Sequence, residues 1–198
     1  MRPSRKDAHQ LLARTLLGSG LEVGPGESPF PLTSGAARVT YLDRWGVRDI
    51  RRLFAEIDRE RFSDPDLQVD LNVDRLSALA DESQDFVIAS HVLEHLVEPL
   101  GQLQDIYRVL KPGGTLLLLL PDRRRTFDRT RPPTSLAHLI DEHQRQVTVL
   151  DDEHLREFVT HVPEDWRPDP PPRDDQERFE RRSGRSTSTS GPSRSSPR

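Results

Sequence analysis

The segment "LEVGPGESPF", residues 21–30, contains the pattern that decides the fold. A strand-like apolar stretch with a single acid at Glu22 runs directly into a turn that contains Gly24 and Gly26. Glycine lets the backbone turn tightly and approach a ligand closely, and a strand that leads into such a turn forms a nucleotide site in several folds. The segments on either side must show which of these folds the chain adopts.

Strands and helices are expected to alternate around this turn. Period-two or continuous apolar runs predict strands, and amphipathic spacing predicts helices. The predicted strands span residues 20–23, 37–43, 67–73, 85–90 and 115–121, and the predicted helices span residues 7–17, 46–62 and 99–110. Such alternation is typical of a mostly parallel sheet with right-handed crossovers, whose ligand sites lie at the carboxyl ends of the strands. The sequence therefore predicts an α/β fold.

The chain changes character after Pro121. Two short helices are expected, within residues 135–146 and 152–162, and no further strand is evident. From Trp166 onward the sequence is proline, serine, arginine and acid with almost nothing to bury, which is typical of disorder. We expect a folded domain over residues 1–165 and a disordered tail over residues 166–198.

The composition excludes several functional classes. A net charge of -4 gives no general attraction to nucleic acid or to an anionic membrane surface. The chain has no cysteine, which excludes disulfides, thiolate zinc sites and a cysteine nucleophile. The amino-terminal residues lack an apolar signal region, and the longest apolar run, Leu116 to Leu120, is too short to span a bilayer. We expect a cytoplasmic protein with no membrane insertion that acts on a small molecule.

Four segments together resemble the motifs of the class I S-adenosylmethionine-dependent methyltransferases. They are "LEVGPGESP", "YLD", "DFVIASHVLEHL" and "LKPGGTLLLLLPD", and they occur in the family's order and spacing between Gly20 and Asp122. The resemblance, to a methyltransferase type 11-like domain, implies a Rossmann-like sheet and S-adenosylmethionine as methyl donor. The following stretch, "PDRRRTFDRTRPPTSLAHLIDEH", resembles a bacterial subgroup associated with glycan or cell-surface synthesis. The acceptor implied is a small molecule or a glycan-related compound.

The resemblance also implies cofactor-binding residues at the first two strands. Gly24 and Gly26 would lie against the methionine moiety, because a side chain there would block the approach of the backbone. Glu22 would orient the loop or meet the amino group of the ligand. Asp43, at the end of the second strand, would accept hydrogen bonds from both ribose hydroxyls.

Further candidates follow the third and fourth strands. Asp74 would lie beside the exocyclic amine of adenine, a place that Asn72 could also fill. Ser90 and His91 would line the cleft near the sulfonium. No catalytic residue is assigned, although His91 is the candidate general base if the acceptor is a hydroxyl. His91 and His95 stand four residues apart, but this segment is better explained as the start of a helix than as a metal site, and no metal is expected.

The chain departs from the family's pattern at three places. Ser28 replaces the third glycine, and a link with several prolines replaces the helix that normally follows. The family's sixth and seventh strands are not evident, so we expect an open sheet edge, which favours a dimer or another partner.

The sequence leaves two other functional classes to compare with a methyltransferase. A non-catalytic binding or scaffolding module is the main alternative. A nicotinamide oxidoreductase is disfavoured, because Pro29 stands where its fingerprint needs a glycine. The three arginines Arg123, Arg124 and Arg125 either meet an anionic group of the substrate or form a solvated turn.

Overall fold

The structure is a computed structural model that describes residues 5–26, 28–32, 37–49 and 64–161. The chain divides into two compact units. The first contains residues 1–121 and 134–149, and the second contains residues 122–133 and 150–198. None of the described helices is long and apolar enough to cross a membrane. The predicted helix over residues 46–62 and the predicted tail over residues 166–198 lie mainly or wholly outside the described residues, so both stay predictions.

The first unit contains a five-stranded sheet in the order β3-β2-β1-β4-β5, with every neighbouring pair parallel. The strands are β1 (Gly18–Val23), β2 (Ala37–Asp43), β3 (Leu67–Gln68), β4 (Gln84–Ser90) and β5 (Leu110–Leu119). This order confirms the predicted α/β, Rossmann-like fold. Val23 of β1 pairs with Leu42 of β2 and with Ala89 of β4, so three strands end side by side at one edge.

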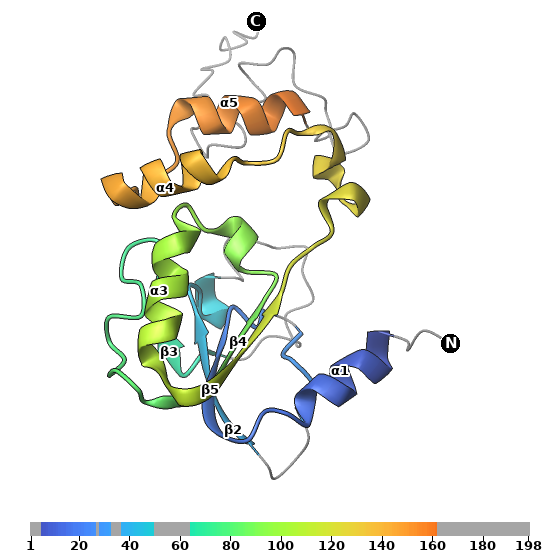
Figure 1. Cartoon of the computed structure of the whole chain (residues 1–198), viewed down its shortest axis with the longest axis vertical. Coiled ribbons are helices and arrows are strands. Elements are labelled where there is room, and N and C mark those ends of the chain that lie inside the picture. The colour runs from blue at the N-terminus through green and yellow to red at the C-terminus, as the bar shows by residue number, and fades with distance from the viewer. Residues whose placement is uncertain (1–4, 27, 33–36, 50–63, 162–198) are drawn as a thin grey trace, which may run out of the picture. The chain divides into compact units, whose positions relative to one another are not determined.

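Two helices cover opposite faces of this sheet (Figure 1). Helix α3 (Pro99–Val109) packs on the face that carries Leu21, Val23 and Val87. Helix α1 (Arg5–Ala13) lies on the other face, where Phe86 and Ile88 form a second cluster with Leu16 and Phe30. Successive residues of a strand point to opposite faces, which is why continuous apolar runs build both clusters.

Short capping motifs set the helix ends. Glu98 is the N-cap of α3 and accepts a hydrogen bond from the Gly101 amide at 2.7 Å. Ser135 caps helix α4 (Leu136–Arg145) by accepting from the His138 amide at 3.2 Å. Helix α5 (Asp152–His161) belongs to the second unit, where Arg131 pairs with Glu157 at 3.3 Å. Both short helices predicted after Pro121 are therefore confirmed.

Strand β3 is shorter than predicted. The expected strand over residues 67–73 ends at Gln68. Asp70 stops it by forming a turn: its carboxylate accepts from the Asn72 amide at 3.0 Å, and its carbonyl accepts from the amides of Val73 and Asp74 at 3.0 and 2.7 Å. These local hydrogen bonds compete with extension of the ladder. The prediction of a seven-residue strand was wrong.

The continuous leucine run at residues 116–120 is typical of a strand covered on both faces, but strand β5 does not meet that expectation. Only Leu117 of the strand is buried, whereas Leu120, just beyond it, is 55% exposed. The reason is position: β5 stands at the end of the sheet, and among the described residues no strand pairs with its outer edge. The expectation of a dimer or partner at this edge stays a prediction.

The segment "SHVLEHL" forms less helix than expected. A single 3-10 turn, η2, spans Leu93–His95, and Leu96 already has extended backbone angles. The regular helix α3 begins only at Pro99. Pro99 disfavours helical angles at the residue before it, which separates the two elements.

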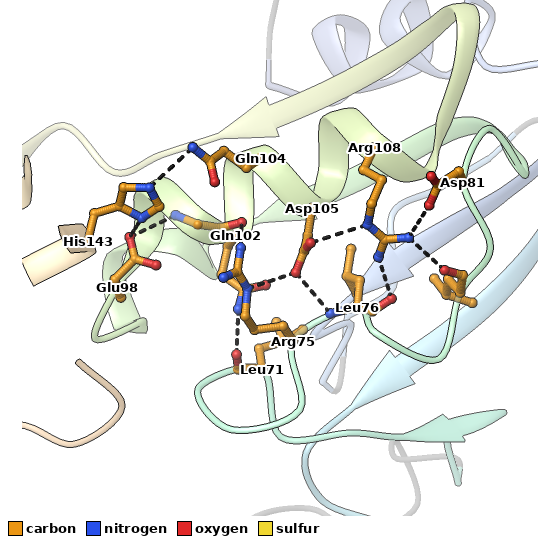
Figure 2. A network of polar contacts seen from close by, with 12 residues as sticks. Leu71, Arg75, Leu76, Asp81, Glu98, Gln102, Gln104, Asp105, Arg108 and His143 are labelled. Atoms are coloured by element: carbon orange, nitrogen blue, oxygen red, sulfur yellow. Dashed lines mark hydrogen bonds and ion pairs between the residues drawn. The ribbon is translucent and has the colours of Figure 1, made fainter. Parts of the chain in front are cut away.

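Side chains of α3 fasten the segment that follows β3 (Figure 2). Arg108 donates to the carbonyls of Leu76 and Leu79 at 2.9 and 2.8 Å and pairs with Asp81 at 2.7 Å. Asp105 accepts from Arg75 at 2.8 Å and from Arg108 at 3.4 Å. We call Arg75, Asp105 and Arg108 the α3 network. It holds residues 71–82 against the helix in place of regular secondary structure.

Helix α4 is fastened to the beginning of α3 by similar contacts. His143 Nδ1 lies 3.1 Å from Glu98 Oε1, and His143 Nε2 lies 3.2 Å from Gln104 Nε2 (Figure 2). Glu98 therefore serves α3 as its cap and α4 as its partner.

Candidate functional site

The glycine turn lies where β1, β2 and β4 end together. Gly24 and Gly26 have φ values of 60° and 54°, a left-handed conformation that side chains rarely adopt. The Gly24 amide donates to the Leu42 carbonyl at 2.7 Å. A Cβ atom at Gly24 would lie 2.8 Å from Val92 Cγ2, whereas a Cβ at Gly26 would meet no atom of a described residue within 4 Å. Gly24 is thus required by packing, and Gly26 borders open space.

Asp43 is joined directly to this turn. Its Oδ2 accepts from the Gly26 amide at 3.4 Å, and its Oδ1 accepts from the Trp45 amide at 3.3 Å. A carboxylate has about four lone-pair positions, so both oxygens keep capacity for further donors. The structure therefore brings together the two predicted features, the glycine turn and the carboxylate that ends β2.

Glu22 lies underneath the loop rather than at its surface. Its side chain is 1% exposed, and Oε1 accepts from the Phe30 amide at 2.7 Å. Burial raises the pKa of this carboxyl to about 7, and the Phe30 hydrogen bond opposes the rise. Oε2 has no hydrogen-bond partner among the described residues. Of the two expected roles, orientation of the loop has a direct contact in the structure.

Asp74 is not brought to the glycine turn by any contact of the described residues. It is exposed, and its carboxylate accepts from the Asp70 amide at 3.2 Å. The alternative residue, Asn72, uses its side-chain oxygen to accept from the Val97 amide at 2.9 Å. Neither predicted residue therefore contacts Asp43.

Asp70 is the carboxylate after β3 that is joined to the Asp43 region. It pairs with Arg44 at 3.0 Å, and the amide of the preceding Val69 donates to the Asp43 carbonyl at 2.9 Å. The sequence prediction missed Asp70 because the expected strand ran through it. The "DLN" pattern at residues 70–72, an aspartate two residues before a bonded amide, is the turn signal that could have found it.

His91 follows Ser90, the last residue of β4. Its φ is 57°, its amide donates to the Leu119 carbonyl at 2.9 Å, and its side chain is 46% exposed. Nδ1 of His91 lies 3.2 Å from Glu94 Oε1. The next residue, Val92, is the one that contacts the Gly24 position. The structure therefore brings His91 to the same edge of the sheet as the glycine turn.

The three consecutive arginines lie in the second unit. Arg123–Arg125 form a 3-10 turn, η3, and Arg124 pairs with Asp122 at 2.9 Å. Arg123 donates to the carbonyls of Arg129 and Arg131. These contacts fit the solvated turn better than a site for an anionic substrate.

Comparison with known proteins assigns the first unit to a family. Residues 21–118 match the family described as methyltransferase domain. Among curated proteins, ubiquinone biosynthesis O-methyltransferases from three strains of Xanthomonas campestris pv. campestris are 29% identical over 114 residues. The aligned part covers 56% of this chain and 45% of each relative, so the chain spans less than half the length of these relatives.

Similarity to solved structures is weaker. An arsenic(III) S-adenosylmethionine methyltransferase from Chlamydomonas reinhardtii is 23% identical, with a TM-score of 0.37, over 50% of this chain and 37% of that protein. A putative S-adenosylmethionine-dependent methyltransferase from Methanococcus maripaludis is 16% identical, with a TM-score of 0.38, over 54% of this chain and 53% of that protein.

The family implies S-adenosylmethionine as methyl donor, and the residues present fit this group. The turn at Gly24 and Gly26 has the backbone conformation for close approach and borders open space at Gly26. The Asp43 carboxylate keeps capacity to accept hydrogen bonds, and the buried Glu22 has an oxygen without a partner among the described residues. With the sheet order and the matched segment, these features show that residues 21–118 belong to the class I S-adenosylmethionine-dependent methyltransferase family.

Proposed function

We propose that this chain binds S-adenosylmethionine at the edge where β1, β2 and β4 end and transfers its methyl group to a small-molecule or glycan-related acceptor. The observation that carries the proposal is the hydrogen bond from the Gly26 amide to Asp43 Oδ2, beside open space at Gly26. A bare backbone turn and a carboxylate with spare lone pairs are what a nucleoside with a positively charged sulfur needs. Family membership of residues 21–118 supports the same assignment.

Each residue of the turn has a separate role in this proposal. Gly24 and Gly26 leave room for the methionine moiety, and Asp43 accepts hydrogen bonds from the ribose hydroxyls. Glu22 holds the far end of the loop through the Phe30 amide and presents its second oxygen to the ligand's amino group. In this proposal the segment from Asp70 to Asp74 binds the adenine. The ion pair between Arg44 and Asp70 joins Asp70 to the residue that follows Asp43 and so favours Asp70 for this role. Asp74 stays a candidate.

Methyl transfer requires mainly that the acceptor atom and the methyl group be held in line. When bound, the sulfonium supplies a methyl group on a good leaving group, so an acceptor held in line reacts without further activation of the donor. Orientation of two reactants in one site can supply several orders of magnitude in rate. The residues of this chain therefore bind and orient the reactants, and His91 is the residue proposed to meet the acceptor.

The acceptor atom is proposed to be oxygen. The three Xanthomonas relatives are named as O-methyltransferases, and they share 29% identity with this chain over 114 residues. The His91 side chain is 46% exposed, which suits a hydroxyl compound of small size or the end of a glycan.

Calorimetry with S-adenosylhomocysteine, the demethylated product, tests this function. The wild-type chain is expected to bind it, and Asp43→Ala is expected to weaken binding by about tenfold to a hundredfold, because two charge-assisted hydrogen bonds are lost. Glu82→Gln is a matched control, since Glu82 is an exposed acid whose side chain has no hydrogen bond or ion pair to a described residue. No binding by a chain with native circular dichroism would contradict the proposal and favour a non-catalytic module.

A further inference from the structure

The residue that follows β4 adopts a conformation that needs an explanation. His91 has a φ of 57°, in the left-handed region, although it is not glycine. Its amide donates to the Leu119 carbonyl at 2.9 Å, a bond that holds this backbone between β4 and β5. Non-glycine residues in this region cost on the order of 1 kcal/mol, and such strain gathers at functional sites. The conformation turns the chain at the strand end and fixes the start of the imidazole side chain.

A carboxylate orients the imidazole of His91. Glu94 belongs to the 3-10 turn Leu93–His95, and its Oε1 lies 3.2 Å from His91 Nδ1. An ionised carboxylate can only accept a hydrogen bond, so Nδ1 must carry the hydrogen. In the neutral imidazole, Nε2 then holds the lone pair. Nε2 has no hydrogen bond or ion pair to any residue that the structure describes.

The residue that follows His91 reaches the glycine turn of the proposed methyl donor site. Val92 directly follows His91, and its Cγ2 lies 2.8 Å from the point where Gly24 would carry a Cβ. The His91 side chain is 46% exposed and that of Glu94 is 23% exposed. The ring is therefore open to an incoming molecule, while its carboxylate partner is the more covered of the two.

We propose that Glu94 is a positioning residue that holds His91 with its Nε2 lone pair available, so that His91 acts as general base on a hydroxyl acceptor. This inference rests on the proposed function and adds the substrate class: an acceptor whose oxygen must lose a proton, such as a phenol or a sugar hydroxyl. A thioether or another acceptor without a proton to lose has no use for the pair. The same logic operates in catalytic triads, where a carboxylate sets the tautomer of a histidine.

The proton and the electrons balance in a single displacement. The acceptor O–H bond breaks, and its proton goes to His91 Nε2, which makes the imidazole a cation beside the Glu94 carboxylate. The acceptor oxygen forms a bond to the methyl carbon, and the bond from that carbon to sulfur breaks with its electron pair remaining on sulfur. No oxidant or further reactant is required.

Glu94→Gln in the full chain is the decisive variant, because glutamine keeps the size of the side chain but replaces a carboxylate that only accepts with an amide that can also donate. Its amide can donate to Nδ1 and favour the opposite tautomer. With catechol as probe, we expect the methyl transfer rate to fall about tenfold to a hundredfold, as for other residues that orient a functional histidine. His91→Gln is expected to lower the rate about a hundredfold or more. Glu82→Gln, which removes an exposed acid that contacts no described residue of the site, is expected to leave the rate unchanged.

A more acidic probe separates positioning from a structural role. Nitrocatechol, measured at a pH where its hydroxyl is already ionised, needs no base, so Glu94→Gln is expected to lose most of its effect there. A structural defect would lower the rates with both probes equally, and that result would overturn the proposal. Nitrogen NMR of the histidine side chains gives a second readout: His91 is expected to carry its hydrogen on Nδ1 in the wild type, and Nε2 protonation in the wild type would also overturn it.

Binding and transfer distinguish this inference from the proposed function. If S-adenosylhomocysteine does not bind to the folded chain, the proposed function fails, and this inference fails with it. If S-adenosylhomocysteine binds and methyl transfer reaches thiophenol or aniline but not catechol, or none of the three, the proposed cofactor site stands and the hydroxyl assignment is overturned. Transfer to catechol that depends on Glu94 supports both.

Discussion

The α3 network and the glycine turn differ in whether their polar groups have hydrogen-bond partners within the described residues. In the network, Arg108 satisfies two backbone carbonyls and two carboxylates, and Asp105 is shared between two arginines. At the turn, one oxygen of the buried Glu22 has no partner among the described residues, and two glycines hold left-handed angles. Polar groups that the protein satisfies hold it together, whereas groups that it leaves open point to a ligand.

The largest expected change in the free energy of unfolding comes from Glu22. Burial raises the pKa of its carboxyl to about 7, so the native state retains a proton that the unfolded chain releases at lower pH. The free energy of unfolding is therefore expected to fall as the pH rises from 4.5 to about 7, by on the order of 3 kcal/mol from this group. Glu22→Gln does not titrate, and we expect it to abolish this part of the pH dependence in urea unfolding measured across the range.

The matched control for this prediction is Glu82→Gln, an exposed glutamate that is expected to keep the wild-type pH dependence. A Glu22→Gln curve that runs parallel to the wild type over this pH range would show that the buried carboxyl is ionised in the native state. The contrast between the two regions would then disappear.

Arg108→Ala tests the α3 network, the region in which the polar groups have partners. The variant leaves the carbonyls of Leu76 and Leu79 without their donor, while the lost pairing with the 73% exposed Asp81 costs little. We expect the free energy of unfolding to fall by about 2–3 kcal/mol. Urea denaturation with an unchanged slope would measure it, beside Arg14→Ala, an exposed arginine whose loss is expected to change stability by less than about 0.5 kcal/mol. Equal losses in the two variants would refute the role of the network.

The two glycines sharpen the comparison within the turn itself. Gly24→Ala places a Cβ 2.8 Å from Val92 at a φ of 60°, and we expect a loss of stability of about 2 kcal/mol. Gly26→Ala at a φ of 54° meets no atom of the described residues within 4 Å, so its cost is expected to be about 1 kcal/mol, from the backbone angle alone. Thermal unfolding measures both changes.

For ligand affinity, in contrast to stability, we expect Gly26 to matter more than Gly24. Because the space beside it is where the proposed ligand approaches, Gly26→Ala is expected to weaken S-adenosylhomocysteine binding far more than its small loss of stability suggests. Wild-type affinity in this variant would mean that the open space at Gly26 is not part of the site.

Local patterns explain which parts of the fold were predictable from sequence. Strands β1, β2 and β4 and the start of α3 at Pro99 carry their signals within a few residues, as apolar runs, a glycine turn and a helix-start proline. The exposure of β5 was not predictable in this way, because it depends on which strands lie beside it. The same leucine run would be buried in the middle of a sheet.

The residues of the site were also predictable only where their signal lies within a few residues of sequence. The glycine turn and Asp43 were readable because each stands at the end of a strand that is marked in the sequence. Asp70 was missed because its partner, Arg44, lies on another loop and because the turn that ends β3 is made by hydrogen bonds of Asp70 itself. The contact between Glu94 and His91 needed the backbone angle at His91, which no residue pattern announces.

The irregular beginning of β5 has a practical consequence. Gln84 pairs with Leu110, whereas Phe86 pairs with Thr115, so two steps along β4 correspond to five along its neighbour. The extra residues of β5 lie around Gly113 and Gly114, at the opposite end of the strand from His91. Extra residues inserted between these glycines should therefore not shift the leucines that follow, so this irregular stretch is a convenient attachment point for a reporter peptide that leaves the methyl transfer edge undisturbed.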